Sequence, residues 1–318
     1  MILQQESQAT GPLQAGELPR VTIGMPVYNG AKYIEQALDS ILAQTYTDFE
    51  LLISDNASTD ATEEICRRYA AADARIHYSR NPKNLGAAAN YNRVIHLARG
   101  RYFRHAAHDD LLAPTNIERC VDILDARPDV VLAYPRMVML NADGEKIDTR
   151  EHSLELEDAR PSDRLAKFAV LCDEESMCDP VFGLFRTAAL RETAMLGAYI
   201  AADMILLAEM ALRGRIVEVP EYLFFERYHA EGSVLSNPTL DDRAAWFDLN
   251  ARGKLINQAP AYRWLWELCA GIARAKLPLP ERIACFIALR HWIWHNKRRL
   301  VFDALRVVQT VFRRAVRR

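Results

Sequence analysis

Short apolar segments alternate with segments of helical period over residues 21–134, and this alternation most constrains the fold. The apolar segments have the length of buried strands, and the segments between them place residues such as Ile34, Leu38 and Ile41 on one side. The predicted strands are 21–26, 49–54, 75–79, 102–108 and 130–134, and the predicted helices are 31–44, 60–70, 87–98 and 114–126. This order predicts an α/β fold with a mostly parallel sheet flanked by helices.

The pattern changes beyond residue 140. The predicted elements there are a helix at 160–172, a strand at 181–185, a helix at 202–213 and a strand region at 215–225. From Asp241 onward the whole chain has a helical pattern. Residues 1–19 are polar and contain Gly and Pro, which predicts a disordered leader. We therefore expect a main domain over 20–240 and a helical C-terminal region over 241–318.

The composition narrows the class of protein. The 318 residues are 50% hydrophobic, which is enough for a large core, and a net charge of −2 argues against nucleic-acid binding. Six cysteines without a Cys-x-x-Cys pair argue for reduced thiols and against zinc. The sequence has no signal-peptide pattern and no apolar run of about 18 residues. These observations predict a cytoplasmic protein.

Polar residues follow four of the predicted strands. They are Pro26–Asn29, Asp55-Asn56, 81–86 and His108–Asp110. Ligands of open α/β sheets bind beyond the carboxyl ends of the strands, so these loops are expected to converge, although each also has an ordinary turn composition. The carboxylates of Asp109 and Asp110 repel each other, and a divalent cation relieves that repulsion. The alternative is a surface turn before the helix near Pro114.

Two common nucleotide-binding signatures are absent from the sequence. No Gly-x-Gly-x-x-Gly follows the first strand, and no Gly-x-x-x-x-Gly-Lys-Ser/Thr occurs anywhere. This argues against a dinucleotide dehydrogenase and a P-loop phosphotransferase. A nucleotidyltransferase would need a basic, Gly-rich loop near the first strand, and residues 25–31 contain a single glycine, Gly30.

Four ordered motifs resemble those of the family 2 glycosyltransferases, which have the GT-A nucleotide-diphospho-sugar transferase fold. The motifs are Val21–Asn29, Ile53–Asp60, Asn84-Leu-Gly86 and His108-Asp-Asp110, and the resemblance covers about residues 20–235. It implies inverting transfer of a sugar from a nucleotide-diphosphate donor, with Mn²⁺ or Mg²⁺ as the cofactor.

The resemblance also implies roles for individual residues. Pro26, Tyr28 and Asn29 would line the nucleotide pocket, Asp55 would accept a hydrogen bond from uracil, Asn84 and Gly86 would lie near the base and ribose, Asp109 would face the ribose and sugar, and Asp110 would bind the metal. Asp203 would be the catalytic base, although Ala202 replaces the family's Glu before it. The alternative for Asp203 is a helix cap.

Three further positions bear on this resemblance. Arg227-Tyr-His229, followed by Ser233, resembles a segment that closes over the diphosphate, so His229 would complete the metal site. The alternative for His229 is an ordinary loop histidine. His108 stands where a DxD motif often has its first Asp. Asn90-Tyr-Asn92 stands where many members have Ala-Arg-Asn, so a sugar- or phosphate-binding arginine is missing or replaced.

Together these features favour a hexosyltransferase that builds cell-surface polysaccharide on a glycan or lipid-linked acceptor. A UDP-sugar is the favoured donor because Asp55 suits uracil. A dTDP-sugar, as in a rhamnosyl-type transferase, stays open because thymine presents a similar edge. A catalytically inactive nucleotide- or sugar-binding scaffold is the alternative from another class.

The C-terminal tail has its own pattern. Residues 297–318 contain eight Lys/Arg and one Asp, a net charge of +7. One helical stripe is apolar: Val301, Leu305, Val308, Phe312 and Ala315; the other faces carry Arg298, Arg299, Arg306, Arg313 and Arg317. This predicts a basic amphipathic helix on the anionic inner face of the cell membrane, with Trp292 and Trp294 in the interface. The alternative is a helix packed on the domain or in a dimer.

Overall fold

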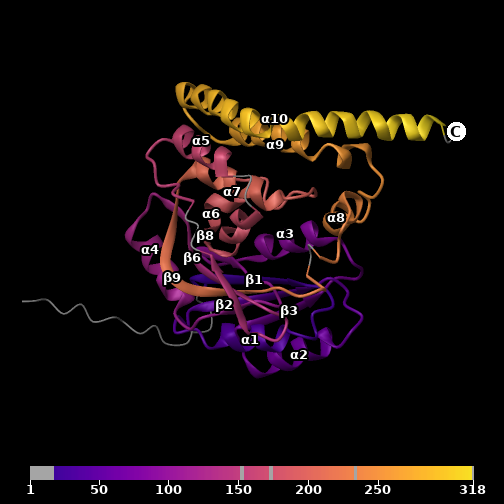
Figure 1. Ribbon diagram of the computed structural model, residues 1–318. Helices are drawn as coiled ribbons and strands as arrows, with labels where there is room; N and C mark the ends of the chain where they lie inside the picture. The colour runs from indigo at the N-terminus through magenta and orange to yellow at the C-terminus, as the bar shows by residue number, and fades with distance from the viewer. Residues whose placement is uncertain (1–17, 151–153, 172–174, 233–234, 317–318) are drawn as a thin grey trace, which may run out of the picture.

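A sheet of nine strands runs through the computed structural model, which describes residues 18–150, 154–171, 175–232 and 235–316 (Figure 1). The strands are β1 Val21–Val27, β2 Phe49–Asp55, β3 Ile76–Arg80, β4 Tyr102–His105, β5 Leu111–Leu112, β6 Val130–Leu140, β7 Lys146–Arg150, β8 Leu184–Arg186 and β9 Arg215–Arg227. Their order in the sheet is β3-β2-β1-β4-β8-β6-β9-β5, with β7 paired to β6. The predicted leader lies outside the described residues except for positions 18 and 19.

The N-terminal strands confirm the parallel part of the predicted sheet. β1 lies between β2 and β4, β2 pairs with β3, and all three pairings are parallel. Every residue of β1 and β2 is buried, as expected of strands covered on both faces. Beyond β4 the sheet is mixed. There β8 runs antiparallel to β4 and β6, and β5 antiparallel to β9, whereas β6 and β9 are parallel.

Helices cover both faces of the sheet. They are α1 Ile34–Leu42, α2 Thr62–Ala72, α3 Ala87–Leu97, α4 Asn116–Ala126, α5 Pro161–Leu171, α6 Thr187–Arg191, α7 Ala202–Arg213, α8 Leu240–Phe247, α9 Pro260–Arg274 and α10 Leu279–Val316, with 3₁₀ helices η1 Glu175–Phe182 and η2 Leu255–Gln258. α1, α2 and α4 share one apolar core with the sheet, and α3, α6 and α7 share another on the opposite face. α5, α9 and α10 form a further layer beyond α7 (Figure 1). The predicted α/β class is confirmed.

Three predicted boundaries were wrong. The strand expected to reach His108 ends at His105, and residues 106–110 leave the sheet. The strand expected at 181–185 begins only at Leu184, because Val181 and Phe182 end η1, and the strand is the three-residue β8 between β4 and β6. The helix expected from Asp60 begins at Thr62. The Asp60 carboxylate accepts the Thr62 N–H at 3.1 Å and the Ala31 N–H at 3.0 Å, so it links two loops instead of opening the helix.

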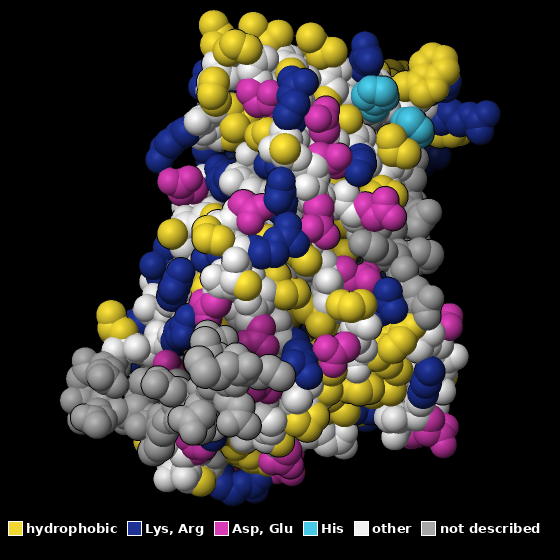
Figure 2. Space-filling model, turned by 90° about the vertical axis from the view of Figure 1, so that its left-hand side faces the viewer, with side chains coloured by type: hydrophobic (Ala, Val, Ile, Leu, Met, Phe, Trp, Pro, Cys, Tyr) yellow, Lys and Arg dark blue, Asp and Glu magenta, His cyan; other side chains and the backbone are white. Residues whose placement is uncertain are grey.

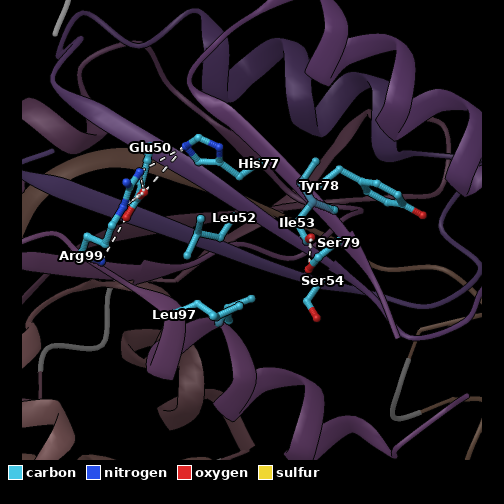
Figure 3. Close-up of a pocket in the computed structure, with 10 residues that line it drawn as sticks. Glu50, Leu52, Ile53, Ser54, His77, Tyr78, Ser79, Leu97 and Arg99 are labelled. Carbon is cyan, nitrogen blue, oxygen red and sulfur yellow. Dashed lines mark hydrogen bonds and ion pairs between the residues drawn. The ribbon is translucent and has the colours of Figure 1, made fainter. Parts of the chain in front are cut away.

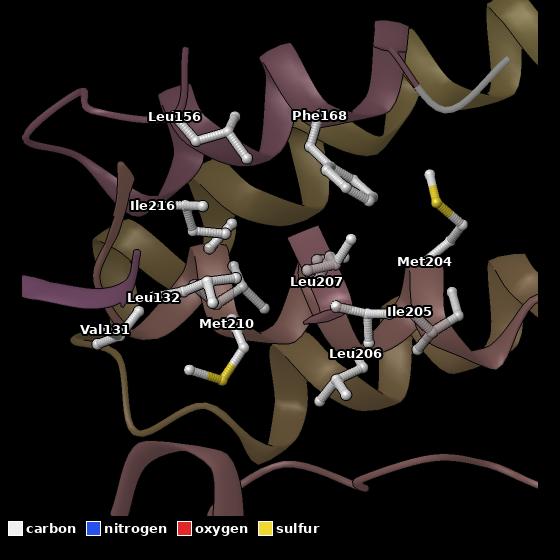
Figure 4. Close-up of a cluster of buried hydrophobic side chains, with 14 of the residues drawn as sticks. Val131, Leu132, Leu156, Phe168, Met204, Ile205, Leu206, Leu207, Met210 and Ile216 are labelled. Carbon is white, nitrogen blue, oxygen red and sulfur yellow. The ribbon is translucent and has the colours of Figure 1, made fainter. Parts of the chain in front are cut away.

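α7 forms the centre of the apolar core that it shares with α3 and α6. All its residues from Met204 to Leu212 are buried, so the helix is enclosed on every side. Its side chains lie in one cluster with Phe168 of α5 and Ile216 of β9 (Figure 4). Trp292 of α10 and Ile272 of α9 belong to the same core, so the C-terminal helices pack on the α/β part. Among the helices that the structure describes, none is long and apolar enough to span a bilayer.

Candidate active site

Hydrogen bonds tie the loop after β1 to the loop after β2. Asn29 has a left-handed backbone with φ of +52°, a conformation that Asn tolerates better than most residues. Its Oδ1 accepts the Thr59 N–H at 2.8 Å, and its own N–H donates to Ser58 Oγ at 2.9 Å. The Gly30 N–H donates to Thr62 Oγ1 at 2.8 Å. These bonds make the two loops one unit.

Asn56 ties the loop after β2 to the loop after β3. Its Nδ2 donates to Asn84 Oδ1 at 2.8 Å and to the Gly86 carbonyl at 3.3 Å. Its Oδ1 accepts the Leu85 N–H at 2.9 Å and Asn81 Nδ2 at 3.2 Å. Asn84 Oδ1 also accepts the Gly86 N–H at 2.8 Å. Asn84 and Gly86 therefore lie beside the end of β2. The hydrogen bonds of the Asn84 side-chain oxygen stabilise these loops.

Asp55 is fully buried at the end of β2. Its Oδ1 accepts the Ser58 N–H at 2.8 Å, and its Oδ2 accepts the Tyr78 hydroxyl at 2.7 Å. Pro26 is buried in the neighbouring β1, whereas the Tyr28 ring is exposed. Each oxygen of Asp55 keeps a second lone pair. Because Asp55 is fully buried, a base can reach these lone pairs only if the side chains that cover Asp55 move.

Asp109 and Asp110 are adjacent in the chain but have different partners. Asp109 Oδ2 lies 2.9 Å from His229 Nε2. Asp110 Oδ1 accepts the Arg227 N–H at 2.9 Å. Both contacts join the loop after β4 to the end of β9. The structure thus brings together three of the residues for which the sequence predicts roles in sugar or metal binding.

The Arg227 side chain closes this corner of the site. Its Nε donates to the Asp109 carbonyl at 3.1 Å, and a terminal nitrogen donates to Gln36 Oε1 at 2.7 Å. The guanidinium lies 4.7 Å from the centre of the Tyr33 ring, and the His229 ring lies 4.8 Å from the same centre. Tyr33 and Gln36 are site residues that the sequence analysis missed, because neither belongs to a recognised motif. Ser233 lies outside the described residues.

The chemistry of this corner fits a divalent cation. Burial raises the pKa of Asp110 well above its usual value, and the charges of Asp109 and Glu226 raise it further. These neighbouring negative charges favour a cation beside Asp110. His229 Nδ1 is buried without a hydrogen-bond partner in the described part of the chain. No three His, Cys, Asp or Glu side chains among the described residues are grouped to hold an ion alone. Mg²⁺ sites commonly take one or two carboxylates and complete their shell with substrate phosphates and water.

Asp203 lies in the first turn of α7. Ala201, two residues before it, has a left-handed backbone with φ of +56° and is the N-cap residue, without a side-chain cap bond. Asp203 Oδ1 accepts the Met204 N–H at 2.9 Å, so Asp203 does not occupy the cap position itself. Burial raises the pKa of the Asp203 carboxyl. A carboxylate with a raised pKa is a stronger proton acceptor than an ordinary aspartate.

Tyr91 of α3 is affected by charges from two parts of the site, the loop after β4 and the first turn of α7. Burial raises the pKa of its phenol, and the charges of Asp109, Asp110 and Asp203 raise it further. All three carboxylates therefore act on the same aromatic side chain, two from the loop after β4 and one from α7. The sequences of these segments alone do not reveal this convergence.

The residues that flank Tyr91 anchor α3. Asn90 Nδ2 donates to the Ser54 carbonyl at 2.8 Å. Asn92 Oδ1 accepts the Leu196 N–H at 2.9 Å. The two asparagines thus hold the helix with Tyr91 between them. The sequence analysis expected a departure from Ala-Arg-Asn at these three positions, and the structure shows that both flanking asparagines anchor the helix.

Helix α8 packs against the loop predicted to bind the base. Gly86 has φ of +83°, and a Cβ at this position would lie 2.7 Å from the Phe247 carbonyl oxygen. The Trp246 ring lies 6.4 Å from the Tyr91 ring, centre to centre. A segment from the predicted C-terminal region therefore borders the predicted donor site.

Two ionisable residues of β4 are buried without hydrogen-bond partners among the described residues. All three guanidinium nitrogens of Arg104 lack a partner, and the group lies 5.6 Å from the centre of the Phe224 ring. Burial lowers the pKa of Arg104 to about 10. Both ring nitrogens of His105 lack a partner, and burial lowers its pKa to about 3, so the imidazole is neutral.

A cavity of about 300 Å³ lies elsewhere, against α3, β2 and β3 (Figure 3). Arg99 Nε donates to Glu50 Oε2 at 2.8 Å in its wall, and the buried Glu50 also accepts the Thr22 hydroxyl at 2.6 Å. These bonds join β1, β2 and the end of α3. None of the predicted site residues lines the cavity. We therefore place the site at the strand ends, where the polar loops and carboxylates converge.

Known sequences show which family the chain belongs to. The profile of glycosyl transferase family 2 matches residues 22–193, more than half of the chain. The RT0329 glycosyltransferase of Rickettsia typhi is 36% identical over 149 residues, which cover 47% of this chain and 43% of that protein. TuaG of Bacillus subtilis, named for teichuronic acid biosynthesis, is 30% identical over 160 residues, which cover 49% and 63%. The matches thus span less than two thirds of these relatives.

Solved structures share the fold. S. aureus TarS in complex with UDP-GlcNAc aligns with a TM-score of 0.55 at 19% identity, over 92% of this chain and 89% of that chain. The mannosyltransferase PcManGT of Pyrobaculum calidifontis, in complex with GDP-Man and Mn²⁺, aligns with a TM-score of 0.52 at 21% identity, over 92% and 88%. Identities this low support the fold alone, and the predicted GT-A fold is confirmed. The family profile goes further: the chain belongs to glycosyl transferase family 2.

Proposed function

We propose that the protein is an inverting glycosyltransferase that moves a sugar from a UDP-sugar to a glycan or lipid-linked acceptor in cell-surface polysaccharide synthesis. The observation that carries the proposal is the junction of the loop after β4 with the end of β9, where Asp109 Oδ2 lies 2.9 Å from His229 Nε2 and Asp110 Oδ1 accepts the Arg227 N–H at 2.9 Å. In this proposal residues 20–240 form the transferase domain, and residues 241–318 form an appended helical region. The reaction takes place at the cytoplasmic face of a membrane, where lipid-linked acceptors are available.

Asp203 is the proposed catalytic base. A sugar hydroxyl has a very high pKa, so its attack on the anomeric carbon requires removal of the proton as the new bond forms. Asp203 belongs to α7, whereas the proposed nucleotide-binding residues belong to the loops after β1, β2 and β3. The base and the nucleotide therefore approach the sugar from different parts of the chain. Attack from the face opposite the leaving diphosphate inverts the anomeric centre.

Asp110 and His229 are the proposed ligands of Mn²⁺ or Mg²⁺. Such an ion, when bound, neutralises the charge that develops on the leaving diphosphate. Asp109 holds the His229 ring in place through the 2.9 Å contact and faces the ribose and sugar in this proposal. The Arg227 N–H fixes the orientation of the Asp110 carboxylate.

The proposed nucleotide pocket is built from the joined loops. Pro26, Tyr28 and Asn29 line it, Asp55 accepts a hydrogen bond from the base, and Asn84 and Gly86 lie near the base and ribose. The network around Asn56 supports this assignment, because it holds the last two residues beside the end of β2. UDP and dTDP present the same hydrogen-bonding edge to Asp55, so direct measurement must separate them.

The test is a calorimetric titration of UDP, dTDP, GDP and ADP, each with Mn²⁺ and with EDTA. We expect micromolar binding of UDP or dTDP that disappears with EDTA. Asp110→Ala should remove the metal-dependent binding, whereas Asp122→Ala, a change at an exposed aspartate of α4, should leave it intact. If none of the four nucleotides binds in the presence of Mn²⁺, the strand-end site is not a donor pocket.

A further inference from the structure

One face of α10 packs on the rest of the protein. Its buried residues recur at helical spacing: Cys285, Ala288, Leu289, Trp292, Asn296 and Asp303. Asp303 Oδ2 accepts the Ala261 N–H of α9 at 2.7 Å, and Glu281 accepts the Ser162 N–H of α5 at 2.8 Å. This face therefore accounts for the docking of α10 on α5, α7 and α9.

The opposite face of α10 is also apolar. At 3.6 residues per turn, six residues lie away from the docked face: Ile287, Trp294, Val301, Leu305, Val308 and Phe312. We call them the outward face. Trp294 is 67% exposed, Val308 65% and Phe312 69%. Single exposed apolar residues are common, but a continuous stripe along a long helix marks an interaction surface.

The sequence prediction for this region needs one correction. Trp292, expected beside Trp294 at a membrane interface, is buried in the core and is part of the docked face. The predicted stripe from Val301 to Phe312 does lie on the exposed side, and Ala315 is exposed as well. The structure extends that stripe toward the N-terminus of α10 through Trp294 and Ile287. Arg317 and Arg318 lie outside the described residues.

Basic residues border the outward face. Arg298 and Arg313 are exposed beside it, and Lys297 Nζ lies 3.4 Å from the centre of the Trp294 ring. The acidic residues of α10, Glu281 and Asp303, are both used in the docked face. Figure 1 places α10 across one end of the molecule, and Figure 2 shows hydrophobic side chains along that upper edge with Lys and Arg among them.

We propose that the outward face of α10 lies flat on an anionic lipid bilayer. Apolar side chains enter the boundary between headgroups and acyl chains, and the bordering basic residues contact anionic headgroups. A second copy of this chain would cover the apolar stripe, but it would also bring two sets of basic residues together. Anionic lipid satisfies both the apolar and the basic character of the surface. This inference rests on the proposed function in one respect: the bilayer surface is where the transferase would meet a lipid-linked acceptor.

The experiment is vesicle co-sedimentation of the full chain without donor or acceptor. One set of vesicles contains phosphatidylcholine alone, and the other also contains phosphatidylglycerol, each at low and high salt. Val308→Ser/Phe312→Ser removes apolar contact from the outward face. Leu97→Ser/Ile147→Ser, at exposed positions on α3 and β7, is the matched control. Circular dichroism checks that each variant is folded.

We expect the wild-type chain and the control to bind the anionic vesicles at low salt and to dissociate at high salt. The outward-face variant should bind the anionic vesicles at least about tenfold more weakly than the wild-type chain. Arg298→Gln/Arg313→Gln should weaken binding and reduce its salt dependence.

Absence of wild-type binding to anionic vesicles would overturn the inference, as would equal binding by the outward-face variant. A dimer in light scattering that the same variant dissociates, without vesicle binding, would assign the face to a second copy and also overturn it. UDP titration of the same preparations separates the two proposals, because a chain that binds UDP but not vesicles refutes the membrane surface alone.

Discussion

Gly86→Ala is the substitution that most directly tests how the C-terminal region meets the donor site. Gly86 has φ of +83° and ψ of +161°, a region that only glycine occupies without strain. An added Cβ would also lie 2.7 Å from the Phe247 carbonyl oxygen and 3.3 Å from the Asp248 Cα. Both neighbours are backbone atoms, so they can yield only if the end of α8 moves as a whole.

The expected cost has two parts. Backbone strain in this conformation costs about 1–3 kcal/mol, and overpacking against the backbone of α8 adds about 1–3 kcal/mol. At roughly 2–4 °C per kcal/mol, the melting temperature should fall by about 4–24 °C. Gly253→Ala is the matched control, because Gly253 has φ of +75° but no atom within 4 Å of an added Cβ. The control should cost about 1–2 kcal/mol from strain alone.

The assays are thermal unfolding by circular dichroism and calorimetric titration of UDP with Mn²⁺. Movement of the loop at Asn84–Gly86 should weaken UDP binding about tenfold, a loss of about 1.4 kcal/mol. Gly253→Ala should leave UDP affinity unchanged. Equal melting temperatures for the two variants, together with wild-type affinity in both, would show that α8 does not rest on this loop in solution.

The remaining predictions concern the site and the C-terminal helix. Asp203→Asn should lower turnover by about 10²–10⁴-fold while UDP affinity stays nearly unchanged, with Asp122→Asn, at an exposed position of α4, as control; unaltered turnover would remove Asp203 from the mechanism. Burial raises the pKa of Asp203, so the protonated side chain contributes to the free energy of unfolding at low pH. That contribution is lost as the pH rises through the raised pKa. Asp203→Asn should therefore melt at or above the wild-type temperature at pH 8, and a clearly lower value would contradict the burial argument. The same shift should place the acid limb of the wild-type kcat profile above the ordinary pKa of aspartate, and a limb at that ordinary value would argue against Asp203 as the base. Trp292→Ala should cost about 3–5 kcal/mol of unfolding free energy, and Trp266→Ala, at a position 70% exposed, much less; equal costs would mean that α10 is not docked.

Much of the N-terminal half of the fold could be predicted from the sequence because its signals are local. Apolar runs and helical periodicity place β1, β2, α3 and α4 within two or three residues of their bounds. The sheet beyond β4 could not be predicted in this way. β8 is three residues long and pairs with β4 and β6 on either side. Its position depends on strands more than 40 residues away, and no local pattern carries that information.

The candidate site shows the same division. Motifs identified the loops with Asp55, Asp109 and Asp110, because each follows a strand. Their partners come from distant segments, so the contacts of Asp55 with Tyr78 and of Asp109 with His229 became visible only in the folded chain. Tyr91 is a middle case, since the sequence predicted a departure from the family at its position but not that the charges of three carboxylates raise its pKa.

Arg104 shows why local rules fail where charge is arranged in three dimensions. An arginine in a buried strand, with no hydrogen-bond partner among the described residues, contradicts every rule for a strand core. Its charge is nevertheless coupled to the site, because Arg104 lowers the pKa of Asp110 and Asp110 raises that of Arg104. Asp109 and Glu226 act on Asp110 in the opposite direction. The charge of Asp110 thus partly offsets the effect of burial on Arg104, at the place where the loop after β4 meets β9. Sequence rules that consider each strand separately predict only the cost of burying the Arg104 guanidinium. A buried residue that breaks such a rule is expected near a functional site.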